Sequence, residues 1–167
     1  MSEDLKTAGT LGLIGSILAI IPDVDIVGYI LLLIALNKAS KAYGNDAIWS
    51  NALKALIIAI VGGILGTLIA VLFVSIFAIF NAAFSGSATA ATASIIGILA
   101  AAYALIVVSG YFWKNAYIEL ARSSNINDFQ RAAKWIWLGA LLTIILVGII
   151  LYIIGLAYSA AGFNKLR

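Results

Sequence analysis

The chain has 167 residues, of which 64% are hydrophobic and only 10% are charged, with a net charge of +3. Soluble domains carry about 25% charged residues, and a chain of this size has too little interior to hide so many apolar side chains. The composition therefore excludes an ordinary soluble domain. It predicts an all-α integral membrane protein that forms a single transmembrane helical domain over residues 1–167.

The first apolar stretch runs from residue 8 to residue 36 and is interrupted by Pro22, Asp23 and Asp25. If it crossed the membrane once, each carboxylate would cost about 2.5–3.5 kcal/mol near the midplane. A turn at this point avoids that cost and leaves two helices of about 20 residues, with Asp25 as the cap of the second. We therefore predict a short N-terminal helical hairpin; one kinked span and a re-entrant pair are the alternatives.

Asp23 and Asp25 also form the weak candidate metal site of the chain, because carboxylate oxygens are ligands of hard divalent cations. A helix cap explains Asp25 without a metal, so we predict no cofactor. Cysteine and histidine are absent, which excludes thiolate chemistry, disulfides and the usual zinc and haem sites.

Two longer helical hairpin elements follow. Residues 53–84 form one long span, 85–94 have the small, hydroxylated composition of a loop, and a second span begins at residue 95 and continues as an amphipathic helix. Asp128 is expected to cap a final long helix that runs to about residue 161. The prediction is a bundle of about five transmembrane helices with its two termini on opposite sides of the membrane.

The segments 37–52 and 114–134 carry most of the basic residues, whereas 85–94 carries none. The positive-inside rule places both basic loops in the cytoplasm. Aromatic residues flank the same loops and are expected to form an interfacial belt. They are Trp49, Trp113, Trp135, Trp137, Tyr43, Tyr111 and Tyr117.

Small residues recur at spacings that place them on one helix face. In lipid, such rows let two backbones approach closely. We expect packing within the bundle or between copies of the chain, and we expect the glycines at 9, 12 and 15 to pack the first helix against the second. The helix-packing candidates are Gly62, Gly66, Ala70, Gly148, Gly155 and Gly162.

Hydroxyl side chains within the spans, such as Ser16, Ser109 and Ser159, are expected to bond to their own helix backbone four residues earlier. A basic and aromatic rim is expected on the cytoplasmic side. It would attract anionic headgroups or dock a protein partner, whereas its modest charge argues against nucleic acid. The rim comprises Lys114, Tyr117, Arg122, Phe129, Arg131, Lys134 and Trp135.

Four stretches carry a resemblance to a known family: "TLGLIGSIL" at 10–18, the proline at 22, "LIALNKASKAYG" at 33–44 and "ELARSSNINDFQRAAKWIWLGALLTIILVG" at 119–148. Together they resemble an archaeal family of small multi-pass membrane proteins, catalogued as domain of unknown function 996. The resemblance implies an archaeal plasma membrane and a compact helical bundle. It implies no activity.

Three functional hypotheses follow from these residues. The leading one is a structural or accessory membrane protein without catalysis, which self-associates as a homo-oligomer or belongs to a larger membrane complex. The alternative is a small oligomeric channel or transporter, with the face of Gly62 and Gly66 or of Gly148 and Gly155 as its lining or contact surface. A metal-dependent enzyme using Asp23 and Asp25 is the third, and we do not expect it.

Overall fold

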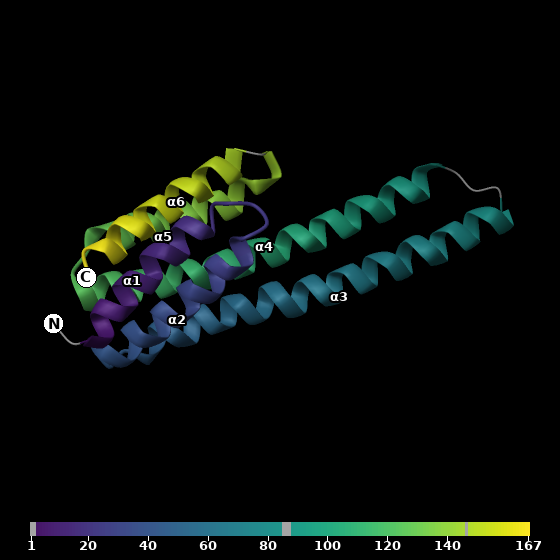
Figure 1. Ribbon diagram of the computed structural model, residues 1–167. Helices are drawn as coiled ribbons and strands as arrows, with labels where there is room; N and C mark the ends of the chain where they lie inside the picture. Colours follow the sequence, from purple (N-terminus) through teal and green to yellow (C-terminus); the bar gives the residue numbers. More distant parts are fainter. Residues whose placement is uncertain (1–2, 85–87, 146) are drawn as a thin grey trace.

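The computed structural model describes residues 3–84, 88–145 and 147–167, and this part of the chain is helical without any strand (Figure 1). The prediction of an all-α protein is confirmed. Three helical segments among the described residues are long and apolar enough to cross a membrane: Asp25–Tyr43, Asp46–Ile64 and Val147–Asn164. The elements are α1 (Glu3–Leu18), α2 (Asp25–Tyr43), α3 (Asp46–Phe84), α4 (Ala88–Ser124), α5 (Asn127–Leu142), the short 3₁₀ helix η1 (Thr143–Ile145) and α6 (Val147–Asn164).

The N-terminal hairpin is present, because α1 ends at Leu18 and the chain reverses before α2 begins. Asp23 in this turn has a left-handed backbone (φ 71°), which aspartate tolerates better than most residues. The predicted cap is wrong. Val24 occupies the position before the helix and makes no side-chain cap bond, and Asp25 lies in the first turn. There its charge favours the positive end of the helix dipole.

The long helices α3 and α4 form the second hairpin, and Figure 1 shows them extending side by side beyond the other helices. The Tyr103 hydroxyl donates to the carbonyl of Leu141, 2.7 Å away, at the last turn of α5. Earlier residues of α4 therefore project past the body of the protein. We define the arm as residues 65–84 and 88–104, and the body as the rest of the described chain. The predicted loop 85–94 is helical from Ala88 onward, because alanine favours helix over coil; residues 85–87 lie outside the described part.

The predicted final helix from 128 to 161 is wrong: it is two helices, α5 and α6, which pack against each other in opposite directions. Glycines close this hairpin, since a Cβ on Gly139 would lie 2.9 Å from the carbonyl oxygen of Gly148. The Thr143 hydroxyl also bonds to the Gly139 carbonyl at 2.7 Å. The turn contains neither proline nor charge, so the apolar sequence resembles one continuous span.

Because α6 returns, the two termini lie at the same end of the molecule (Figure 1). A Cβ on Gly9 would lie 2.9 Å from the backbone of Leu166. The prediction of termini on opposite sides is therefore wrong. The segments 37–52 and 114–134 are also mostly helical, and each is interrupted only by a short turn. Both turns lie at the same end as the termini (Figure 1), because Lys165 near the carboxyl terminus pairs with Asp128, just after the second turn, and Asn45 in the first turn bonds to Glu119.

The largest fully buried side chains are three aromatic rings near this end. Tyr117, Phe129 and Phe163 are fully buried. Phe129 packs edge-on against Phe163, with ring centroids 5.0 Å apart, and lies 6.3 Å from Tyr117. Isoleucines near the opposite turns are exposed, for example Ile26 (69%) and Ile144 (71%). The molecule thus combines a packed core at its charged end with an apolar outer surface, as expected for helices in lipid.

Candidate functional site

The two predicted metal candidates, Asp23 and Asp25, are not joined by a third acidic residue in the described structure. Asp23 is exposed and Asp25 is partly exposed. Among the described residues, no group of three or more acidic side chains could hold a metal ion. The candidate metal site therefore consists of two carboxylates only, Asp23 in the connecting turn and Asp25 at the start of α2.

Instead, the main polar feature of the interior is a cluster of hydroxyl groups, which we call the hydroxyl cluster: Ser16, Tyr117 and Ser159. The Ser159 hydroxyl of α6 lies 2.8 Å from the Ser16 hydroxyl of α1 and 2.8 Å from the Tyr117 hydroxyl of α4. All three residues are fully buried. One serine thus connects three helices that are distant in sequence.

The hydroxyl cluster overturns part of the expected local bonding. Ser16 and Ser159 bond across helices, and the Ser109 hydroxyl donates to the Ala55 carbonyl of α3 at 3.0 Å. Ser75 does bond to its own helix, through the Val71 carbonyl at 2.8 Å. Periodicity alone could not separate these cases, because each serine lies in similar apolar sequence.

Chemically, the hydroxyl cluster is suited to holding helices together. A serine hydroxyl is a weak nucleophile unless a base activates it, and within the described structure these three groups bond to one another through their hydroxyls. A second pair, Tyr29 and Tyr152, lies nearby with its oxygens 3.4 Å apart. In lipid, such interhelical bonds specify which helix faces meet.

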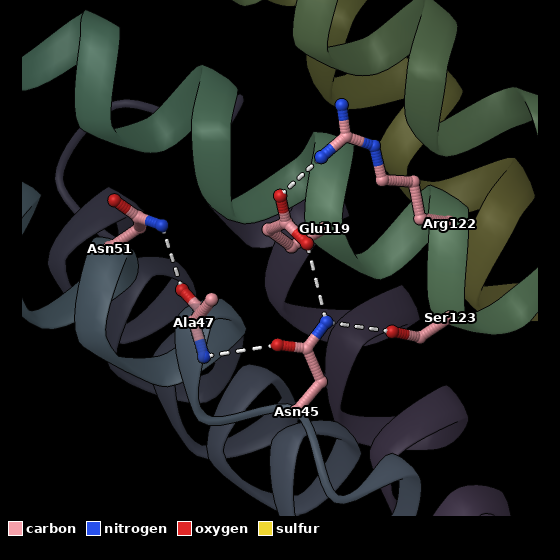
Figure 2. Close-up of polar contacts among 6 residues, drawn as sticks. All are labelled: Asn45, Ala47, Asn51, Glu119, Arg122 and Ser123. Carbon is pink, nitrogen blue, oxygen red and sulfur yellow. Dashed lines mark hydrogen bonds and ion pairs between the residues drawn. The ribbon is translucent and has the colours of Figure 1, made fainter.

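A second polar cluster ties the charged ends of α3 and α4 together (Figure 2). The Asn45 side-chain nitrogen donates to Glu119 at 3.3 Å and to Ser123 at 3.0 Å, while its oxygen accepts from the Ala47 amide at 3.1 Å. Arg122 pairs with Glu119 at 2.7 Å. Asn45 therefore caps α3 and also anchors the first polar turn to α4, which places both polar turns at one end.

Asp128 has a different role from the predicted helix cap. Ile126 precedes α5, and Asp128 lies one residue inside the helix, with its side chain only 10% exposed. It pairs with Lys165 just beyond α6 and, at 3.9 Å, with Arg131. The role of Lys165 could not be predicted from the sequence, because only the return of α6 brings the carboxyl-terminal residues back to the start of α5.

The basic residues of the predicted rim lie at the surface, but the assignment of two aromatic residues to this rim is wrong. Tyr117 and Phe129 belong to the core, because neighbouring helices cover them completely. Trp113 is also buried and does not belong to the expected belt. Lys114 lies 5.0 Å from the Tyr111 ring and 5.1 Å from the Trp137 ring, a cation–π arrangement. The remaining rim residues are exposed or half-buried: Lys114, Arg122, Arg131, Lys134 and Trp135.

The small residues fall into covered and open positions. Gly148 contacts the end of α5, a Cβ on Gly155 would lie 2.9 Å from the Ile136 backbone, and one on Gly162 would lie 2.7 Å from the Phe129 ring. Gly62 faces Leu105 across the second hairpin, Gly66 is more open, and the Ala70 side chain lies outside the described residues.

The glycines of α1 pack in two directions. Gly15 faces α2, as expected, whereas the ring of Phe163, in the last turn of α6, covers Gly12. Gly9 likewise faces the carboxyl-terminal residues. The first helix is therefore packed between α2 and α6, which explains how the termini come together.

The helical fold and the three helical segments able to cross a membrane define an α-helical membrane protein. More particularly, the chain belongs to a family of proteins of unknown function, DUF996, whose model matches residues 24–157. It is also similar to the "Uncharacterized protein MJ1644" of Methanocaldococcus jannaschii, with 29% identity over 156 residues, covering 90% of this chain and 86% of that protein. No solved structure matches the chain. The predicted family is confirmed.

Proposed function

We propose that the protein is a structural membrane component without catalysis, and that it self-associates through its arm. The observation that carries the proposal is a row of small residues on α4 that remain exposed among the described residues. Gly97, Ala100, Ala101 and Ala104 are all exposed. Their spacing of three and four residues places them on one helix face.

This row differs from the glycines inside the body. A Cβ on Gly97 would meet no heavy atom of the described structure within 4 Å, whereas one on Gly155 would meet α5. Small residues lose little by facing lipid, but they let a second helix approach closely and gain dispersion contacts. The open row therefore supports contact with another helix from outside the chain.

The length of α3 supports the same proposal. Its charge-free part, residues 55–84, is about 45 Å long, whereas the hydrocarbon core is about 30 Å thick. Tilt alone would have to reach about 48°, beyond the usual range of about 0–40°. Exposed side chains on the arm, such as Leu68, Leu72 and Ile76, would be covered if arms from several copies pack together.

The charged end of the molecule would face the cytoplasm of an archaeal cell, with the body and arm in the cell membrane. This orientation rests on the positive-inside rule and on the clustering of Lys38, Lys41, Lys114, Arg122 and Arg131 toward one end. The termini would lie on the same side as these residues.

A channel or transporter is less well supported. Its proposed lining included Gly148 and Gly155, and both lie against α5. Gly62 is likewise occupied by Leu105. These contacts leave the glycine faces little open surface toward a pore, so assembly through the arm is the better proposal.

The proposal is tested by extracting the protein in a mild detergent and measuring the mass and composition of the particle. We expect a discrete homo-oligomer that Ala101→Leu reduces to monomers. Ala161→Leu is the matched control, because it adds the same side chain to an exposed position of α6 outside the arm. A wild-type monomer without partners, or an unchanged mass in Ala101→Leu, would contradict the proposal.

A further inference from the structure

A groove lies between α2 and α3 near their charged ends, with a volume of about 660 Å³. Its lining changes character along its length. Lys38, Lys41 and Asp4 lie at the charged end, and Ile30 and Ile34 lie further along α2. Both helices contain segments that could cross a membrane, so the groove lies between two candidate spans and is open to what surrounds them.

The charged end of the groove is positive. The Lys38 ammonium pairs with Asp4 at 3.1 Å, while Lys41 is exposed and has no ion pair among the described residues. Two lysines therefore face one carboxylate, which leaves a net positive charge. An anionic group here would meet Lys41 directly and would share Lys38 with Asp4.

The rest of the groove is apolar and accessible. Ile30 and Ile34 are 51% and 42% exposed, and they lie one helical turn apart on the same face of α2. The half-buried ring of Trp49 lines the groove from α3. An indole ring at this level suits a membrane interface, because it combines an apolar surface with an N–H donor.

We propose that this groove binds one anionic membrane lipid. Its phosphate lies against Lys41 and Lys38, and one hydrocarbon chain lies along Ile30 and Ile34. The complementarity between a positive end and an apolar wall selects an amphiphile over a free anion, and the lysines select an anionic headgroup over a zwitterionic one.

The test uses the full chain, which has no cysteine, in vesicles. A fluorophore is attached at Val27→Cys, an exposed position of α2 about one turn before Ile30 and outside the groove lining. Its quenching is compared between brominated phosphatidylglycerol and brominated phosphatidylcholine in mixed vesicles. We expect phosphatidylglycerol to be preferred, and we expect Lys41→Gln to lower the preference about fivefold. Lys41→Gln leaves the Lys38–Asp4 ion pair intact, so the variant keeps this contact between α1 and α2.

The matched control is a fluorophore at Val108→Cys on α4. Val108 is also exposed, and it lies outside the groove. It also has a lysine in its neighbourhood, because Phe112, one turn further along α4, has the Lys54 ammonium 5.8 Å from its ring. We expect little lipid preference there and no effect of Lys41→Gln. An equal preference at both positions, or a preference that survives Lys41→Gln, would overturn the proposal. So would competition by inorganic phosphate alone, because it would identify a free-anion site.

Discussion

Ser159 illustrates how single polar atoms organise this protein. It is one of the few hydroxyls in α6, and it accepts or donates toward both Ser16 and Tyr117 at 2.8 Å. The sequence identified Ser159 as a polar residue within a span but could not identify its partners. Those partners lie 143 and 42 residues away, and they depend on packing that no local pattern encodes.

Replacing Ser159 with alanine is expected to destabilise the protein by about 1–2 kcal/mol, because it leaves two buried hydroxyls without this partner. Unfolding of the purified protein in mixed detergent micelles measures the change. Ser75→Ala is the control, since Ser75 is exposed and its hydroxyl bonds to the Val71 carbonyl of its own helix. Equal stability of the two variants would show that the hydroxyl cluster contributes nothing to folding.

The two classes of glycine lead to a second prediction. Gly148→Ala is expected to destabilise the fold by about 1–3 kcal/mol, because its Cβ would clash with the backbone at the end of α5. In a detergent that keeps the protein monomeric, Gly97→Ala is expected to be neutral or slightly stabilising, since the space beside it within one chain is open and alanine favours helix. Thermal unfolding of both variants in the same detergent tests the contrast, and a similar loss in both would refute it.

At the level of elements, α1 and α2 could be predicted with boundaries within a few residues, because proline and charges mark their ends. The start of α4 could not, because the sequence predicts it at residue 95 and the helix begins at Ala88, in a stretch without proline or charge. The break between α5 and α6 could not. It lies in the apolar run "LLTIILVGII", where only glycine and threonine distinguish a tight turn from a span. The Asp128–Lys165 pair was missed for the same reason.

Lys165→Gln is expected to loosen the carboxyl-terminal residues from the start of α5, because Asp128 loses its nearer cationic partner. Amide hydrogen exchange of residues 160–167 should accelerate several-fold, with little change in α2. Arg167→Gln serves as the control, because it removes a basic residue from the same tail without removing that pair. Unchanged exchange in Lys165→Gln would show that the ion pair does not hold the tail.

At the scale of the whole molecule, the chain forms a body with both termini at one end and an arm that extends from it (Figure 1). This arrangement predicts that cysteines at Lys6 and Asn164, both exposed, are labelled by a membrane-impermeant maleimide from the same side. A cysteine at Asn45 is expected to share that side. Labelling of positions 6 and 164 from opposite sides would require a continuous final span and would reject the α5–α6 hairpin.

Self-association through the arm is the central claim, and the absence of cysteine allows a direct measurement. Gly97→Cys and Ala101→Cys, each as the sole cysteine, are oxidised in native membranes, and Ala161→Cys on α6 is the control. We predict covalent dimers at 97 or 101 and monomers at 161, because a disulfide requires close approach of the two backbones. Monomers at both arm positions, or dimers at 161 in equal yield, would contradict association through the arm.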